Sequence, residues 1–136
     1  MQVKFHLQYK NSIQNSMATP VQFISILHQA KTQAHIWHHQ TTKYPEHKAL
    51  GHFYENITDF IDSFVESLQG DMGRFTGYSS ESFVDWKEGQ AYEYLKMLCQ
   101  YVESERAGLG TASWIQNQVD DLEKILYQIK YELTLM

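Results

Sequence analysis

Apolar residues recur every three or four positions over four stretches of this chain, which is the periodicity of amphipathic helices. No stretch shows the alternation of apolar and polar residues that is typical of strands. The pattern predicts helices near residues 19–42, 45–69, 90–106 and 112–133. The residues expected to face the core are Phe23, Leu27, Ala30, Ala34 and Trp37, then Ile57, Phe60, Ile61, Phe64, Val65 and Leu68, then Tyr94, Leu95, Leu98 and Val102, and finally Ile115, Val119, Leu122, Leu126, Ile129 and Leu133. The sequence therefore predicts an all-α, four-helix bundle.

Turn residues mark the expected helix ends. Thr19 followed by Pro20 is typical of an N-cap and a first helical turn. Tyr44-Pro45 should break the chain between the first and second helices, because the residue before proline disfavours the α conformation. Gly70 is expected to cap the second helix. The third helix should stop at Gly108 and Gly110, and the fourth should be capped by Thr111 or Ser113.

The lengths of the connections predict how the helices are wired. Short breaks near Tyr44 and Leu109 predict two antiparallel hairpins. The segment 70–89 is far longer than a tight turn needs, and Ser80 to Glu88 within it has the pattern of a short capped helix. A helix of the predicted length spans roughly 35 Å, so this connection can travel the length of the bundle. Parallel second and third helices joined by one long crossover are the wiring of ferritin-like bundles.

Length and composition predict one domain with a tail. The chain has 136 residues, enough for one sizeable core, and we expect a flexible tail at 1–17 and the bundle at 18–136. The tail is polar and contains Lys4 and Lys10 but no acid. The single cysteine, Cys99, allows no internal disulfide and fits a reducing compartment, so we expect a cytoplasmic protein. No apolar run approaches the ~18 residues of a membrane span.

Two polar stripes point away from the expected core. At about 100° per residue, histidines of the first helix and carboxylates of the second lie opposite their own apolar stripes. These residues are His28, His35 and His39, then Glu55, Asp59, Asp62 and Glu66. A solvated surface is one interpretation of such stripes. The other is a metal site, because a cation relieves the repulsion of like charges four residues apart, and mixed imidazole and carboxylate ligands suit iron, zinc or manganese.

The predicted hairpin restricts which residues can share a metal ion. With a turn near Tyr44, the residue level with His35 is expected around position 53. Asp62 lies about nine residues further along, which is roughly 14 Å on the helix axis. If His35 and Asp62 share an ion, the second ligand must therefore come from another copy of the chain, placed by a twofold axis.

The spacing of four residues resembles a known family. His35 is followed after eleven residues by His47, after fourteen more by Asp62, and after three more by Glu66. This spacing is similar to that of the metal ligands in the Dps mini-ferritins. FYENITDFIDSFVESLQG resembles the second helix of that family, and the expected helix at 80–88 resembles its crossover helix. The resemblance implies a ferroxidase site between two subunits, which binds one or two iron ions, with zinc or manganese as substitutes, at His35, His47, Asp62 and Glu66.

The resemblance also implies a biological role. It predicts oxidation and sequestration of iron or protection from oxidative stress, in a homo-oligomer with twofold interfaces such as a dodecameric shell. Lysines in the tail, Lys4 and Lys10, faintly resemble the segment with which some members bind DNA. Gly51 departs from the family, which often has a further carboxylate there, and this departure bears on the second metal position. The alternative is a ferritin-like oligomeric interaction module without metal chemistry, for which the nine tyrosines would supply contact surface.

Overall fold

The computed structural model describes residues 17–135, which form a bundle of four α-helices. These are α2 (Pro20–Gln40), α3 (Tyr44–Met72), α4 (Gln90–Glu105) and α5 (Ser113–Glu132), with a short 3-10 helix, η1 (Arg106–Leu109), after α4. No residue from 17 to 135 lies in a strand, so the predicted all-α class is confirmed. The predicted tail lies outside the described residues except for Met17. Within the described chain, no helix is both long and apolar enough to cross a membrane.

The predicted apolar stripes meet in one core. Almost all of the residues expected to face inward are buried, and Phe60 and Val65 are only partly so. Large aromatic side chains fill the space between α2 and α4: Phe23 stacks on Tyr101 with ring centroids 5.8 Å apart, and Trp37 meets Tyr94 edge-on at 5.3 Å. Burial of a side chain of this size stabilises the fold by roughly 1.5–3 kcal/mol.

The helix ends agree with the predicted breaks to within a few residues. Thr19 caps α2 and forms a capping box with Gln22, as the Thr-Pro pair suggested. The α3 helix continues past Gly70, because Gly73 supplies the positive φ of 87° that ends the helix. The predicted caps of α5 were wrong by one position, since Ala112 is its N-cap.

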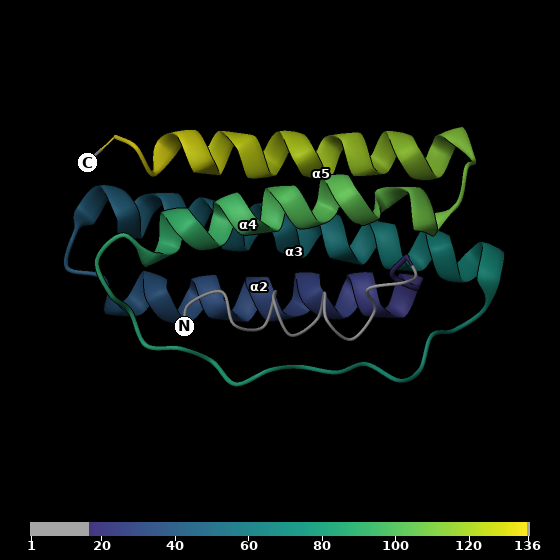
Figure 1. Cartoon of the computed structure of the whole chain (residues 1–136), viewed down its shortest axis with the longest axis horizontal. Coiled ribbons are helices and arrows are strands. Elements are labelled where there is room, and N and C mark those ends of the chain that lie inside the picture. Colours follow the sequence, from purple (N-terminus) through teal and green to yellow (C-terminus); the bar gives the residue numbers. More distant parts are fainter. Residues whose placement is uncertain (1–16, 136) are drawn as a thin grey trace.

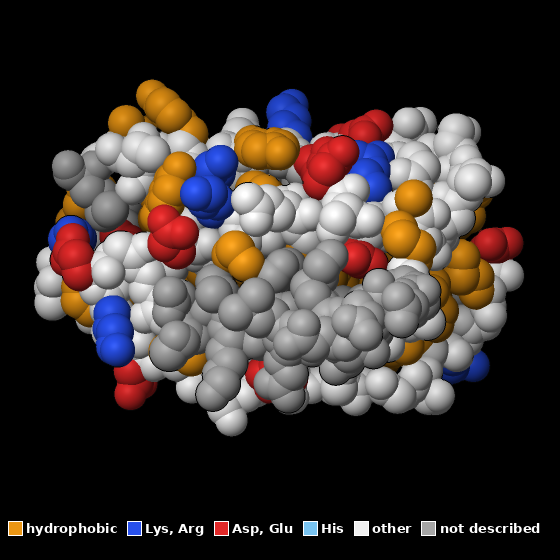
Figure 2. All heavy atoms as spheres, viewed as in Figure 1, with side chains coloured by type: hydrophobic (Ala, Val, Ile, Leu, Met, Phe, Trp, Pro, Cys, Tyr) orange, Lys and Arg blue, Asp and Glu red, His pale blue; other side chains and the backbone are white. Residues whose placement is uncertain are grey.

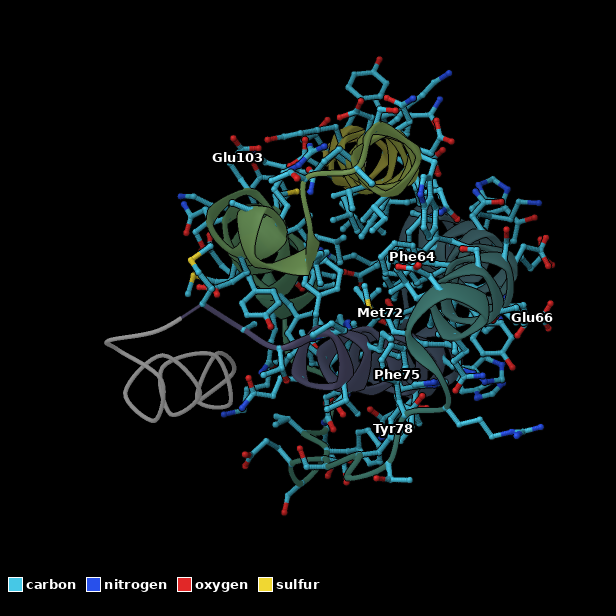
Figure 3. The ribbon with its side chains drawn as sticks, turned by 90° about the vertical axis from the view of Figure 1, so that its right-hand side faces the viewer. Phe64, Glu66, Met72, Phe75, Tyr78 and Glu103 are labelled. Carbon is cyan, nitrogen blue, oxygen red and sulfur yellow. The ribbon has the colours of Figure 1, made fainter. Side chains whose placement is uncertain are left out.

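The helices form a four-cornered bundle. The α2 helix packs chiefly on α3, α3 on α5, and α5 on α4, so that α3 and α4 lie at opposite corners in the end view of Figure 3. In Figure 1, α3 and α4 run in the same direction, and α2 and α5 run in the other. The chain between Met72 and Gln90 returns along the whole length of α2 to connect them.

That connection, residues 73–89, contains no helix, and we call it the strap. The helix predicted at 80–88 is therefore wrong. Its backbone bonds to polar side chains of α2 instead of to itself: Glu81 N–H donates to Gln29 Oε1, and Gln33 both accepts from Val84 N–H and donates to its carbonyl oxygen. These contacts hold the strap extended, because a backbone amide already bonded to α2 is not available for a helical turn.

Side chains also hold the strap on the bundle. Trp37 donates its indole N–H to the carbonyl oxygen of Val84 over 2.7 Å. Trp86 donates its own indole N–H to Glu46 over 2.8 Å. Phe75 lies close to the end of the bundle, whereas Tyr78 lies further out on the strap (Figure 3). The strap therefore covers α2 on the side away from α5.

Candidate functional site

The four predicted ligands lie on the outer side of the α2–α3 hairpin. His35 on α2 and His47 on α3 are partly buried, whereas Asp62 and Glu66 on α3 are exposed. Figure 3 shows Glu66 pointing away from the bundle, while Phe64, two residues earlier, points into it. The α3 helix thus has one apolar inner face and one acidic outer face.

The register of the hairpin separates these ligands into two groups. The ring of His35 stacks on Tyr54, with centroids 3.8 Å apart and planes at 17°, close to position 53 expected from the turn. Asp62 lies eight residues beyond Tyr54, or about 12 Å along the axis. Asp62 is instead close enough to His28 for its charge to act on that imidazole. Within one chain, Asp62 is therefore remote from His35.

His38 and His47 form a pair that the sequence reasoning missed. Nδ1 of His38 lies 2.7 Å from the carbonyl oxygen of His47, and Nδ1 of His47 lies 2.8 Å from the carbonyl oxygen of His38. Their rings stack at 3.8 Å with planes at 15°. The register that pairs His35 with Tyr54 places His38 level with position 51, so the length of the turn alone gave no signal for this pair.

The pair belongs to a longer row of rings along the hairpin. Tyr44 lies 6.1 Å from His47, His47 lies 3.8 Å from His38, His38 lies 5.9 Å from His35, and His35 lies 3.8 Å from Tyr54. These contacts restrict the rotation of each imidazole. The two tyrosines at the ends of the row were not predicted as part of the site.

The remaining histidines of the hairpin have different surroundings. His39 is exposed, and its ring lies 4.6 Å from that of His35. Partial burial, with the neighbouring imidazoles of His39 and His38, lowers the pKa of His35. Nδ1 of His52 on α3 lies 3.0 Å from Oε1 of Glu132 on α5, and this contact links the first hairpin to the second.

The acidic stripe of α3 has no hydrogen-bond or ion-pair partner among the described residues. No hydrogen bond or ion pair within residues 17–135 engages its four carboxylates, which are Glu55, Asp59, Asp62 and Glu66. All four are exposed. In the described part of a single chain, no three side chains of His, Cys, Asp or Glu are arranged to hold a metal ion. The predicted ligands thus lie on one face but in two groups.

The other sides of the bundle differ from this face. On the face shown in Figure 2, acidic and basic side chains are interspersed and no histidine is visible. The α4 and α5 helices contain no histidine. Cys99 on α4 is buried, and burial raises the pKa of its thiol to about 11, so it behaves as a small apolar residue of the core.

Comparisons with known proteins match this chain to a phage protein and to a protein family. It is 28% identical, over 115 residues, to an uncharacterized 14.6 kDa protein in the mobD-ri intergenic region of Enterobacteria phage T4, and the alignment covers 84% of this chain and 87% of that protein. No solved structure matches. A family of unknown function, DUF5856, matches residues 38–133, which include α3, α4 and α5. The chain therefore belongs to the DUF5856 family.

Proposed function

We propose that this protein binds ferrous iron at sites shared by two copies of the chain, as a mini-ferritin of the Dps type. The observation that carries the proposal is the arrangement of one outer face. Imidazoles lie near one end of this face, and two exposed carboxylates that form no hydrogen bond or ion pair within residues 17–135, Asp62 and Glu66, lie further along it. A twofold axis near position 58 of α3 would bring the imidazoles of one copy to the carboxylates of the other.

The donor set suits this substrate. Neutral imidazole and carboxylate together are typical ligands for iron, zinc and manganese. The carboxylates neutralise part of the charge of the cation, and they stabilise ferric iron more than ferrous iron. Hydrogen peroxide would accept one electron from each of two ferrous ions together with two protons, its O–O bond would break, and two water molecules would form. Hydrolysis of the ferric product would then release protons. The connection wiring of the bundle, with α3 parallel to α4, also supports a ferritin-like relationship.

The first test is removal of either ligand group. His35→Ala,His47→Ala and Asp62→Asn,Glu66→Gln should each abolish ferrous iron binding measured anaerobically, while the helical circular dichroism signal is retained. Glu93→Gln,Asp121→Asn is the matched control, because it removes two exposed carboxylates from α4 and α5. This control should bind iron as the wild type does. Loss of binding in the control would indicate that net charge, and not the two ligand groups, retains the ion.

Complementation tests whether two chains share the site. When the two inactive variants are unfolded together and reassembled, a mixed interface keeps all four ligands at one of its two sites. Random pairing in equal amounts should therefore restore about a quarter of the wild-type sites. Mixed oligomers that bind no iron would refute the shared site. In that case the oligomeric interaction module, favoured by exposed aromatic residues such as Tyr44 and Tyr131, would be the better description.

A further inference from the structure

The imidazole rings of His35 and His47 are held in place in different ways. A carbonyl oxygen only accepts, so Nδ1 of His47 donates to the carbonyl oxygen of His38, over 2.8 Å. Donation of one ring N–H to a backbone carbonyl is the arrangement that usually orients a metal-binding histidine. Within residues 17–135, no hydrogen bond engages either ring nitrogen of His35. The orientation of the His35 ring must therefore come from its packing.

Tyr54 is the ring that packs most closely on His35. The two centroids lie 3.8 Å apart, and the planes are nearly parallel, at 17°. On the same helix as His35, the ring of His39 lies 4.6 Å away but is tilted by 47°, and the ring of His38 lies 5.9 Å away. His39 is also exposed, whereas Tyr54 is partly buried. The contact with Tyr54, across the hairpin from α2 to α3, therefore fixes the plane of the His35 ring.

This contact leaves the ring nitrogens of His35 open to a ligand. The bonding directions of Nδ1 and Nε2 lie in the plane of the imidazole, whereas Tyr54 covers its face. A metal ion bound by either nitrogen would lie in the plane of the ring, beside the stack and not within it. The stack therefore orients the imidazole without competing for the ion.

The position of Tyr54 also fits the arrangement of two chains. The proposed twofold axis lies near position 58 of α3, which is midway between Tyr54 and Asp62. In two α3 helices related by this axis, position 54 of one copy is level with Asp62 of the other. Tyr54 therefore lies where the imidazole of one copy would meet the carboxylates of the other.

We propose that Tyr54 is a positioning residue of the shared metal site, and that it holds the His35 imidazole in the plane in which that ring binds the ion. The inference rests on the proposed function, because it concerns the same site. Tyr54 acts through the face of its ring and supplies no donor atom to the metal. Its hydroxyl group is therefore not required, and phenylalanine should serve as well at this position.

The test measures binding of Co²⁺ alone to the full-length protein, because imidazole and carboxylate ligands also suit this ion. Tyr54→Leu removes the aromatic face but keeps an apolar side chain. We expect Co²⁺ affinity per folded chain to fall about ten-fold, which is typical for loss of a group that orients a metal ligand. At saturating Co²⁺ the absorption spectrum, which reports the number and type of ligands, should match the wild type, since all four ligands remain. Tyr54→Phe should have wild-type affinity.

Tyr44→Leu is the matched control on the same hairpin. Tyr44 lies 6.1 Å from His47, whose orientation a hydrogen bond already fixes, so this variant should bind Co²⁺ as the wild type does. Wild-type affinity in Tyr54→Leu, or an equal loss in Tyr54→Leu and Tyr44→Leu, would overturn the inference. A loss in Tyr54→Phe as large as that in Tyr54→Leu would also overturn it, because the hydroxyl group and not the stacked ring would then matter.

The same measurement in Asp62→Asn,Glu66→Gln protein separates this inference from the proposed function. Co²⁺ binding that is lost there, with wild-type affinity in Tyr54→Leu, would overturn the role of Tyr54 and leave the shared site intact. Wild-type affinity in Asp62→Asn,Glu66→Gln would refute the shared site, and the positioning role would fall with it. A further ten-fold loss when Tyr54→Leu is added to His35→Ala would show that Tyr54 does not act through His35.

Discussion

The α2–α3 and α4–α5 hairpins bury similar apolar stripes in one core but use their polar residues differently. On α4–α5, Arg106 donates to Gln116, Asp120 and Glu123 at 2.7–3.0 Å. Gln116 in turn donates to the carbonyl oxygens of Arg106 and Gly110. These groups hold the turn between the two helices, and most of their hydrogen-bonding capacity is used within the fold.

On α2–α3, two sets of polar atoms remain open. The Nε2 atoms of His38 and His47 and the carboxylates of Asp62 and Glu66 have no hydrogen-bond partner within residues 17–135. They lie on long helices and not on loops, so their positions are fixed by the packed core beneath them. Polar groups that satisfy one another stabilise a fold, whereas rigidly placed groups with open donor atoms can bind a ligand. This difference is why we propose that binding takes place on the first hairpin.

The two hairpins should respond very differently to loss of a tryptophan. Trp37 on α2 is fully buried and bonds to the strap, whereas Trp114 on α5 is 41% exposed. Trp37→Ala should lower the free energy of unfolding by about 3–5 kcal/mol, because it leaves a large cavity. Trp114→Ala should change it by no more than about 0.5 kcal/mol. Urea denaturation measures both, and similar losses would contradict the division between a buried anchor and a surface residue.

A smaller effect is expected where α2 holds the strap. Gln33→Leu removes both hydrogen bonds to Val84 and leaves the Val84 N–H without its partner. We expect the free energy of unfolding to fall by about 1–3 kcal/mol, and hydrogen exchange of the Val84 amide to accelerate. Gln128→Leu, at an exposed position of α5, is the control and should have little effect. Unchanged protection of Val84 in Gln33→Leu would show that other contacts hold the strap.

The sequence predicts the helices well because their determinants are local. The stripe of α5, from Ile115 to Leu133, repeats every three or four residues, and each of its predicted inward residues is buried. The strap was predicted wrongly because its determinants are distant: Gln33 and Val84 are 51 positions apart in the chain. The local capping pattern at 80–88 is real, but tertiary hydrogen bonds to α2 satisfy the backbone in another way.

The candidate site was predictable only in part, for a related reason. Helical periodicity places His35 and Asp62 on outer faces, and the length of the turn predicts the residue level with His35. The His38–His47 pair depends on finer detail, namely the register of two helices to within one residue and the missing Cβ of Gly51. Helical periodicity alone did not reveal this pairing.

The arginine of the second hairpin should matter for stability and not for metal binding. Arg106→Lys loses the fork of N–H groups that bonds to Gln116, Asp120 and Glu123, and we expect a loss of about 1–2 kcal/mol in the free energy of unfolding. Arg74→Lys, at an exposed position of the strap, is the control. Ferrous iron bound per folded chain should be the same in both variants. A selective loss of iron in Arg106→Lys would contradict the division of roles between the hairpins.

Ionisable groups on the two hairpins have pKa shifts of opposite direction. Burial and the neighbouring Glu103 carboxyl raise the pKa of Glu123 to about 7, against the opposing charge of Arg106. Burial and the charge of Lys31 lower the pKa of His28, against the opposing charge of Asp62. A fold that binds a proton more tightly than the unfolded chain loses stability as pH rises, and a fold that binds it less tightly gains stability.

Glu123→Gln and His28→Gln should therefore change the pH dependence of unfolding in opposite senses. The stabilising contribution of Glu123 is present below about pH 4.5 and is lost as pH rises to about 7, so Glu123→Gln should exceed the wild type in stability at pH 8 by on the order of 1 kcal/mol. The contribution of His28 is present above pH 6.5 and is lost on acidification, so His28→Gln should lose less stability than the wild type between pH 7 and pH 5. Urea unfolding at a series of pH values from 5 to 8 measures how the stability of each variant changes with pH, and Glu93→Gln is an exposed control. Changes of the same sign in the two variants would show that at least one of the two groups does not titrate as its surroundings require.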